Sequence, residues 1–364
     1  MEKKPRIIAI VVNDVLYDQR MIRTCSTLAH FYDVELWGRK KFNTKAKHLN
    51  FKQVRLHFLI NKGPLFYLIL NIRFFYRLLS SEFDVVHAVD LDTLVAGFFA
   101  AKLKGKKIVY DSHEYFTEVP ELIHRPLKKK IWNWIESMLV PRVDAAITVS
   151  QPIANIYTKL YKLPFAVVRN CPEVSLLSLE TKSEETPYII YQGALNKGRG
   201  LEALIIAMKD IPIHLKIAGT GDIENELKKL IEIHKLSHKI FFLGVLQPDK
   251  LIGITQNAFV GYNSMEKLGL SYYYSLSNKF FDYIQAHVPV ITNGFPAYKA
   301  INDTYKCCYL SEAQSTKISN AINMLLNNKN AYKELKDNTI IAAKELNWNK
   351  EKINLIKIYE KIVS

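Results

Sequence analysis

The sequence has few of the features that mark several large protein classes. No apolar stretch approaches the roughly 18 residues needed to cross a bilayer, because Asp90 and Asp92 interrupt the longest one. The apolar run from Ile7 to Val12 meets Asn13 and Asp14 at once, which makes it too short for a secretory signal. The cysteines number only four, without metal-binding spacing: Cys25, Cys171, Cys307 and Cys308.

These absences restrict the class of protein. With so few cysteines we expect a reducing compartment and no disulfide framework. With no spanning segment we expect a soluble or peripheral protein with a cytoplasmic location. Hydrophobic residues make up 49% of the 364 residues and charged residues 23%, which excludes a mainly disordered protein.

Positive charge is in excess. The formal net charge is +15, of which +10 falls within residues 1–180. Such a balance favours anionic partners, whether nucleic acid, phosphorylated substrates or an acidic membrane surface. The charge alone does not choose among these partners.

Short β-branched runs alternate with helical patterns along the chain, and the alternation starts again after a polar stretch at residues 180–187. The runs predicted to be strands are residues 7–12, 34–37, 54–59, 85–88, 107–111, 145–149 and 165–168 before that stretch, and 188–191, 214–218, 240–243, 259–262 and 290–292 after it. This pattern predicts parallel sheets built from right-handed βαβ units. We therefore expect an α/β protein with two doubly wound, Rossmann-like domains that face each other across a central cleft. The expected domains are residues 1–180 and 186–345, and an amphipathic helix within residues 346–364 is expected to pack back on the first domain.

A glycine-rich turn follows the strand that ends at Tyr191. Gly193 allows a ligand to approach the backbone, and Lys197 and Arg199 place cations beside it. An ordinary strand-to-helix turn with solvated basic residues would give the same pattern. The turn is therefore a candidate diphosphate site only in combination with other features.

A second candidate segment runs from Tyr272 to Ile291. Ser277 is predicted to cap a helix, which places Asn278 and Lys279 in the first turn, where amides and an ammonium group can reach a phosphate. Asp282 lies one turn later and could accept hydrogen bonds from both hydroxyls of a ribose. Alternatively, Asp282 only complements the helix dipole.

The ordered set of these motifs resembles the glycosyltransferases of family 4. The resemblance in the second half rests on residues 191–201, 219–222, 241–245 and 277–291, and in the first half on residues 83–92, 109–114 and 143–150. It covers nearly the whole chain. It implies the GT-B fold and transfer of a sugar from a nucleotide diphosphate donor to an acceptor hydroxyl, with retention of the anomeric configuration.

The resemblance also implies roles for individual residues. Gly193, Arg199 and Lys279, with Lys197 and Asn278 nearby, would bind the diphosphate of a UDP- or GDP-linked sugar, and Asp282 would bind the ribose. The base would lie against backbone near Gly244 and Val245. His113 would position the donor sugar and is not expected to act as a base, so the implied catalytic residues are His113, Arg199 and Lys279. No cofactor or metal is expected, since the two cations stabilise the leaving group.

Three positions depart from the family pattern. Tyr274 stands where a glutamate usually helps to hold the donor sugar, and Asp282 replaces the second glutamate of that pair. Ala194 stands where many members have an arginine. Arg199, aided by Lys197, is then expected to provide more of the positive charge.

Aspartates and aromatic basic segments raise separate hypotheses. The Asp90-Leu91-Asp92 tripeptide could hold a metal, but we favour Asp92 as the cap of a helix over residues 94–103.

Residues 64–80 are apolar and aromatic, and residues 125–134 place basic side chains before two tryptophans. These segments favour contact with an anionic membrane and a saccharide or lipid-linked acceptor at the inner leaflet, as in assembly of bacterial surface polysaccharide. A buried helix and a solvated turn remain the alternative.

Three other functions compete with sugar transfer. A dinucleotide-dependent oxidoreductase is disfavoured because residues 13–18, after the first strand, contain no glycine. A nucleotide-sugar epimerase of the same fold would use the same donor pocket without an acceptor. A non-enzymatic nucleic-acid-binding protein would explain the charge, but the sequence has no recognised nucleic-acid module.

Overall fold

The computed structural model describes residues 4–41, 43, 48–174 and 186–363. The chain divides into two compact units, one formed by residues 1–169 with 351–364 and the other by residues 170–350. The second unit begins earlier than the expected boundary at residue 180, because Cys171 packs into its core. Most of the expected linker, residues 180–187, lies outside the described residues.

Among the described residues, the first unit contains a seven-stranded sheet in the order β3-β2-β1-β4-β5-β6-β7, and all paired strands are parallel. Its strands are β1 (Arg6–Ile10), β2 (Asp33–Arg39), β3 (Lys52–Leu56), β4 (Val85–Val89), β5 (Lys107–Ser112), β6 (Ala145–Thr148) and β7 (Phe165–Val167). Its helices are α1 (Gln19–Leu28), α2 (Gly63–Leu79), α3 (Asp90–Leu103), α4 (Pro120–Ile123), α5 (Pro126–Leu139) and α6 (Gln151–Tyr161), with the 3-10 turns η1 (Phe116–Glu118) and η2 (Val140–Arg142).

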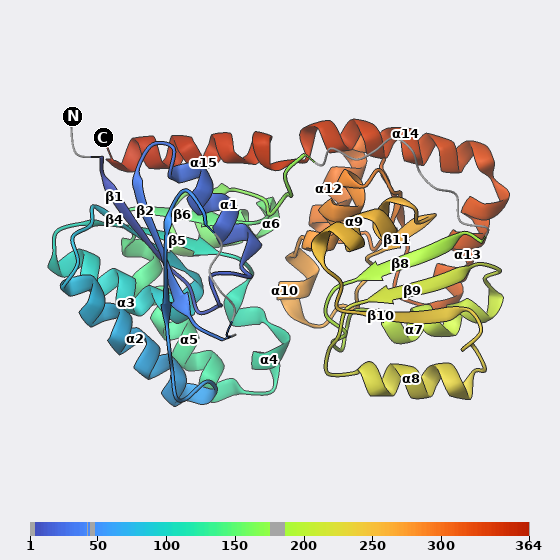
Figure 1. Ribbon diagram of the computed structural model, residues 1–364, viewed down its shortest axis with the longest axis horizontal. Helices are drawn as coiled ribbons and strands as arrows, with labels where there is room; N and C mark the ends of the chain where they lie inside the picture. The colour runs from blue at the N-terminus through green and yellow to red at the C-terminus, as the bar shows by residue number, and fades with distance from the viewer. Residues whose placement is uncertain (1–3, 42, 44–47, 175–185, 364) are drawn as a thin grey trace. The chain divides into compact units, whose positions relative to one another are not determined.

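Helices cover both faces of this sheet (Figure 1). In β4, Val86 and Ala88 face α3, where a Cβ on Gly97 would lie 3.1 and 3.2 Å from their side chains, so any larger residue would force these neighbours to shift. His87 points to the opposite face and contacts Tyr359 of the last helix, α15 (Trp348–Val363). The C-terminal helix therefore packs on the first unit.

The second unit contains, within residues 186–350, a six-stranded parallel sheet in the order β10-β9-β8-β11-β12-β13. Its strands are β8 (Tyr188–Gln192), β9 (His214–Ala218), β10 (Ile240–Gly244), β11 (Val260–Tyr262), β12 (Val290–Thr292) and β13 (Cys308–Leu310). Its helices are α7 (Leu201–Ala207), α8 (Glu224–Ile233), α9 (Pro248–Gln256), α10 (Gly269–Tyr274), α11 (Asn278–Gln285), α12 (Pro296–Tyr305), α13 (Ser315–Asn327) and α14 (Lys329–Glu345), with the 3-10 turn η3 (Met208–Asp210).

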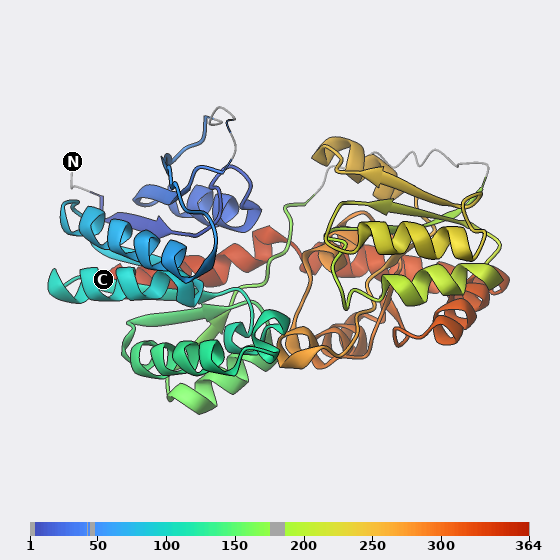
Figure 2. The same cartoon turned by 90° about the horizontal axis from the view of Figure 1, so that it is seen from below.

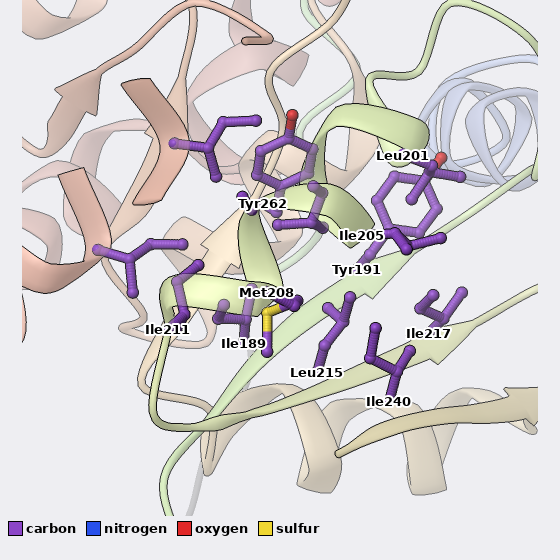
Figure 3. Close-up of a cluster of buried hydrophobic side chains, with 14 of the residues drawn as sticks. Ile189, Tyr191, Leu201, Ile205, Met208, Ile211, Leu215, Ile217, Ile240 and Tyr262 are labelled. Carbon is purple, nitrogen blue, oxygen red and sulfur yellow. The ribbon is translucent and has the colours of Figure 1, made fainter. Parts of the chain in front are cut away.

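Alternation along the strands divides the core of the second unit into two clusters. Ile189 and Tyr191 of β8 belong to the cluster formed with α7, α8 and α13, and Figure 3 shows part of it. Tyr188 and Ile190 belong to the cluster formed with α11, α12 and α14 on the other face. A sheet buried on both faces explains why its strands are almost uniformly apolar.

Both sheets reverse their strand order at one point, between β1 and β4 in the first unit and between β8 and β11 in the second. Ligands of doubly wound proteins bind beyond the carboxyl ends of the strands at such a point. In the second unit the glycine-rich turn follows β8, so it lies at this edge. In the first unit Asp90 follows β4, and His113 follows the adjacent strand β5.

Candidate nucleotide-sugar site

The loop after β8 is built from glycines in conformations that other residues avoid. Gly193, Gly198 and Gly200 have φ values of 127°, 82° and 67°. A Cβ on Gly219, in the loop after β9, would lie 1.9 Å from the carbonyl oxygen of Gly193, so these two loops touch backbone to backbone. A Cβ on Gly193 itself would meet no atom within 4 Å, so the backbone is open there.

Arg199 is held beside the carboxyl edge of the sheet. Its guanidinium carbon lies 4.8 Å from the ring centroid of Tyr272, and its Nη1 lies 3.4 Å from the sulfur of Met265. Its Nε is buried without a hydrogen-bond partner among the described residues. The guanidinium is therefore fixed by an aromatic ring and a thioether, neither of which neutralises its charge.

Lys279, in the first turn of α11, is buried with 8% of its surface exposed. Its Nζ lies 4.1 Å from the ring centroid of Tyr191, the penultimate residue of β8. Burial and then the nearby charge of Arg199 hold the pKa of Lys279 well below its ordinary value. Within the described ranges neither cation forms an ion pair with a carboxylate. The side chains of Arg199 and Lys279 therefore lie close enough to repel each other, and an anion bound between them would relieve this repulsion.

Asp282 lies one turn further along α11 and meets the end of β8 through Gln192. The Nε2 of Gln192 donates to the Oδ2 of Asp282 at 3.0 Å, and the Oε1 of Gln192 accepts from the hydroxyl of Thr255 at 2.7 Å. This chain of hydrogen bonds fixes the orientation of the carboxylate. Gln192 and Thr255 were not among the predicted site residues, since neither has a recognisable motif.

The start of α11 follows the prediction only in part. Ser277 is the N-cap residue, but its hydroxyl donates to the Oδ1 of Asn263 at 2.6 Å and does not cap the helix. The side chain of Asn278 is engaged as well, since its Oδ1 accepts from Asn170 at 2.7 Å. The first helical amides therefore lack a side-chain cap, and they stay available to a ligand.

The remaining predicted residues of the second unit lie around the same edge. Gly244, with φ of 64°, accepts from the amide of Gly219 at 2.8 Å, and Val245 is 76% exposed. Lys197 is exposed on the glycine-rich loop. Tyr274 ends α10, and its ring packs edge-on to Tyr273 with centroids 4.9 Å apart.

In the first unit, His113 lies between two carboxylates. Its Nε2 is 3.1 Å from the Oδ2 of Asp111, and its amide donates to the Oδ1 of Asp90 at 2.8 Å. Burial alone would lower the pKa of His113, but Asp111 and Asp90 outweigh burial and raise it. The imidazole is thus held in one orientation with its charged form favoured, which suits positioning better than proton abstraction.

Asp111 organises this group of side chains. Arg20 donates to both of its oxygens, at 2.8 and 3.3 Å, and His87 Nε2 lies 3.3 Å from it. Burial opposes ionisation, but Arg20 and His113 outweigh it and hold the pKa of Asp111 well below its usual range. On the far side of His87, its Nδ1 lies 2.5 Å from the hydroxyl of Tyr359. Sequence reasoning identified His113 but not the partners of Asp111 in this group, because its members are up to 272 residues apart.

The aspartates after β4 differ from expectation. The helix begins at Asp90, which has φ of 54°, so Asp92 lies inside the first turn and is not the cap. A short acidic side chain is favourable both at the N-cap and in the first turn of a helix, so the sequence does not distinguish these two positions for Asp92. Burial, Asp90 and Glu114 raise the pKa of Asp92 well above its ordinary value. Among the described residues no cluster of three or more His, Cys, Asp or Glu side chains could hold a metal ion.

Comparisons with known proteins agree with this architecture. The model described as Glycosyltransferase Family 4 matches residues 21–173, and the model described as Glycosyl transferases group 1 matches residues 179–344. No sequence among the curated proteins matches the chain.

Solved structures share the fold. Sucrose-phosphate synthase from Thermosynechococcus elongatus has a TM-score of 0.81 at 16% identity, with 99% of each chain covered. Anabaena HepE in complex with UDP and glucose has a TM-score of 0.77 at 14% identity, also with 99% of each chain covered. WaaG, a glycosyltransferase involved in lipopolysaccharide biosynthesis, has a TM-score of 0.73 at 12% identity, over 97% of this chain and 99% of that one.

Two family models in succession span most of the chain, and each of the two parallel sheets has the doubly wound strand order that the resemblance implied. The chain therefore belongs to the family 4 type of glycosyltransferases and has the GT-B fold.

Proposed function

We propose that this glycosyltransferase moves a sugar from a UDP- or GDP-linked donor to an acceptor hydroxyl with retention of the anomeric configuration. One observation supports the donor assignment most directly. Arg199 and Lys279 are gathered at the carboxyl edge of β8, and burial and mutual repulsion make this arrangement costly without an anion. The structures of HepE with UDP and with UDP-glucose favour uridine among the two nucleotides.

The chemistry follows from where charge develops. As the anomeric bond breaks, negative charge accumulates on the departing diphosphate, and Arg199 and Lys279 are fixed where they would stabilise it. Asp282, oriented by Gln192, would accept from the ribose hydroxyls. The departing phosphate would take the proton of the acceptor hydroxyl, so the protein's task is to hold both substrates on one face of the sugar. We assign His113 to the transferred sugar. No metal is required in this scheme.

The acceptor is proposed to be a saccharide on a lipid carrier at the cytoplasmic face of the membrane, in assembly of a bacterial surface glycan. Two structural neighbours support this class of acceptor, since WaaG is a glycosyltransferase involved in lipopolysaccharide biosynthesis and WaaB is a lipopolysaccharide outer core galactosyltransferase. No helix among the described residues is both long and apolar enough to span a bilayer. A lipid-linked acceptor would therefore have to be reached from the membrane surface.

A panel of nucleotides tests the donor site. Thermal unfolding is measured with UDP, GDP, UDP-sugars, GDP-sugars and inorganic diphosphate. A ligand that binds only the folded state raises the melting temperature. We expect one nucleotide class to stabilise the protein, and Arg199→Ala or Lys279→Ala to abolish the effect while the fold is kept. Stabilisation that survives both substitutions would contradict the assignment.

Product analysis tests the reaction. With acceptor present, the anomeric proton coupling of the product, measured by NMR, reports retention or inversion. Conversion of the donor sugar to its epimer in the absence of acceptor would identify the epimerase instead.

A further inference from the structure

Helix α2 has two apolar stripes, although covering a sheet requires only one. The stripe toward the core is buried and has a spacing of four residues: Phe66, Leu70, Phe74 and Leu78. The second stripe is exposed by 52, 56, 46 and 66%, in order: Leu65, Leu68, Ile72 and Tyr76. The fold of the first unit does not account for this second stripe.

Helix α5 repeats the feature. Its inner side holds Glu136 and Leu139, whereas its outer side exposes three large apolar side chains by 78, 58 and 61%, in order: Leu127, Ile131 and Trp134. Helix α3, which packs against both α2 and α5 (Figure 2), adds Phe99 and Leu103. Nine of the 24 exposed large hydrophobic side chains in the described ranges therefore lie on three helices that form about one eighth of the chain.

The helices α2 and α5 also meet directly. The rings of Tyr67 and Trp132 pack edge to face with centroids 6.1 Å apart. The exposed stripes thus belong to one layer of the first unit. We call the outer surface of α2, α3 and α5 the apolar-basic face.

The charge on this face has one dominant sign. Helix α2 contains no acidic residue, the acids of α3 are confined to its first turn, and the only acid in α5, Glu136, is buried. Lys128 and Lys130 are exposed on α5, with no ion pair to another described residue, while Lys129 pairs with Glu118 at 2.5 Å. Arg125 is exposed at the start of α5. Apolar side chains flanked by cations are the composition of surfaces that bind anionic lipid.

We propose that the apolar-basic face docks on the surface of an anionic lipid bilayer. Leucine and isoleucine side chains would enter the boundary between headgroups and acyl chains, Trp134 would lie at headgroup level, and the lysines would contact lipid phosphates. A second copy of this chain fits less well, because two such faces brought together would oppose Lys128 and Lys130 to the same lysines of the partner. The proposal goes beyond the donor site and does not depend on it.

Vesicle flotation tests this proposal with the full chain. The probes are vesicles of phosphatidylcholine alone and of phosphatidylcholine with 30% phosphatidylglycerol. We expect flotation with the anionic vesicles, little with the neutral ones, and weaker flotation at high salt. The double variant Lys128→Gln, Lys130→Gln should bind anionic vesicles about 25-fold more weakly, at roughly fivefold for each charge. Leu68→Ser with Ile131→Ser, which removes apolar contacts of both helices, should abolish flotation.

Matched variants in the second unit control for general effects. Ile233 is 72% exposed and Lys229 is exposed, both on α8. Ile233→Ser and Lys229→Gln should leave flotation unchanged. All variants should keep the wild-type melting temperature and its nucleotide response, which separates failure here from failure of the proposed donor site.

Three results would overturn the proposal. The first is absence of flotation by the wild-type protein. The second is equal loss of flotation in the α8 controls. The third is a stable dimer in light scattering without lipid that Leu68→Ser with Ile131→Ser dissociates, since this would assign the face to a second copy of the chain.

Discussion

Replacing Lys279 by methionine should stabilise the free protein and remove its nucleotide response. Lys279 is buried and has its pKa lowered by burial and by Arg199, so the folded state binds this proton less tightly than the unfolded state does. Exchange of a buried ion pair for apolar groups of similar volume gains up to about 4 kcal/mol, and we place Lys279, a buried cation that faces Arg199, in the upper part of that range at about 3–4 kcal/mol. Loss of the contact between Nζ and the ring of Tyr191 removes up to about 2 kcal/mol of that gain. The expected net gain is about 1–2 kcal/mol.

Thermal unfolding without ligand measures this gain. For a domain of about 150–250 residues, each kcal/mol raises the melting temperature by about 2–4 °C, so we expect an increase of about 2–8 °C. With UDP at 100 times its dissociation constant, the wild-type protein should gain about 2.7 kcal/mol and the variant nothing. Lys216→Met is the matched control, because the Nζ of Lys216 also lies over a tyrosine ring, that of Tyr188, at 3.7 Å.

The pH dependence gives an independent check. Because the folded-state pKa of Lys279 is lowered, wild-type stability should rise with pH between that lowered value and the ordinary value of 10.5. The advantage of the methionine variant should therefore be largest at neutral pH and shrink as pH approaches 10.5. A variant that is less stable than wild type at pH 7, or that still responds to UDP, would refute the reasoning.

Three further substitutions probe other groups. Asp282→Asn should weaken binding of UDP more than binding of inorganic diphosphate in calorimetry, because only the nucleotide has ribose hydroxyls for the carboxylate; equal weakening would argue against the ribose role. Asp111→Asn leaves buried Arg20 without its counter-charge and should cost about 3–5 kcal/mol in urea unfolding near neutral pH; since the pKa of Asp111 is lowered, this contribution should decline as pH falls from the ordinary value of 3.8 toward the lowered one. Burial raises the pKa of Glu136 from 4.5 to about 7, so wild-type stability should fall as pH rises through that range, and Glu136→Gln should be more stable above it by about 3 kcal/mol. An unchanged difference between pH 5 and pH 8 would contradict the last prediction, and Glu121→Gln, at an exposed position of α4, serves as its control.

The pattern of apolar residues predicted most of the sheet strands, because a strand that is buried on both faces consists of a short run of apolar residues. The strand β13 (Cys308–Leu310) was not predicted. Only three residues long and with Leu310 exposed, it gives no distinct local signal. The start of α3 was placed too late for a similar reason, since Asp90 adopts a positive φ that the sequence does not indicate.

The candidate site divides in the same way. The sequence predicted the glycine-rich turn with Gly193, Gly198 and Gly200, because glycine is the residue that most easily adopts the positive φ values found there. The role of Ser277 was only partly readable, because Asn263 from another element competes for its hydroxyl. The hydrogen bond between Gln192 and Asp282 joins residues 90 positions apart, and no local pattern predicts it.

The sequence by itself determined the architecture and the family, since βαβ periodicity, glycine positions and the order of motifs are local properties of the chain. The tertiary structure alone decided which side chains share an environment. Burial placed Lys279 beside Arg199, and folding brought Asp111 between Arg20 and His113. Such electrostatic properties arise from desolvation and from charges distant in sequence, so they exist only once the chain is folded.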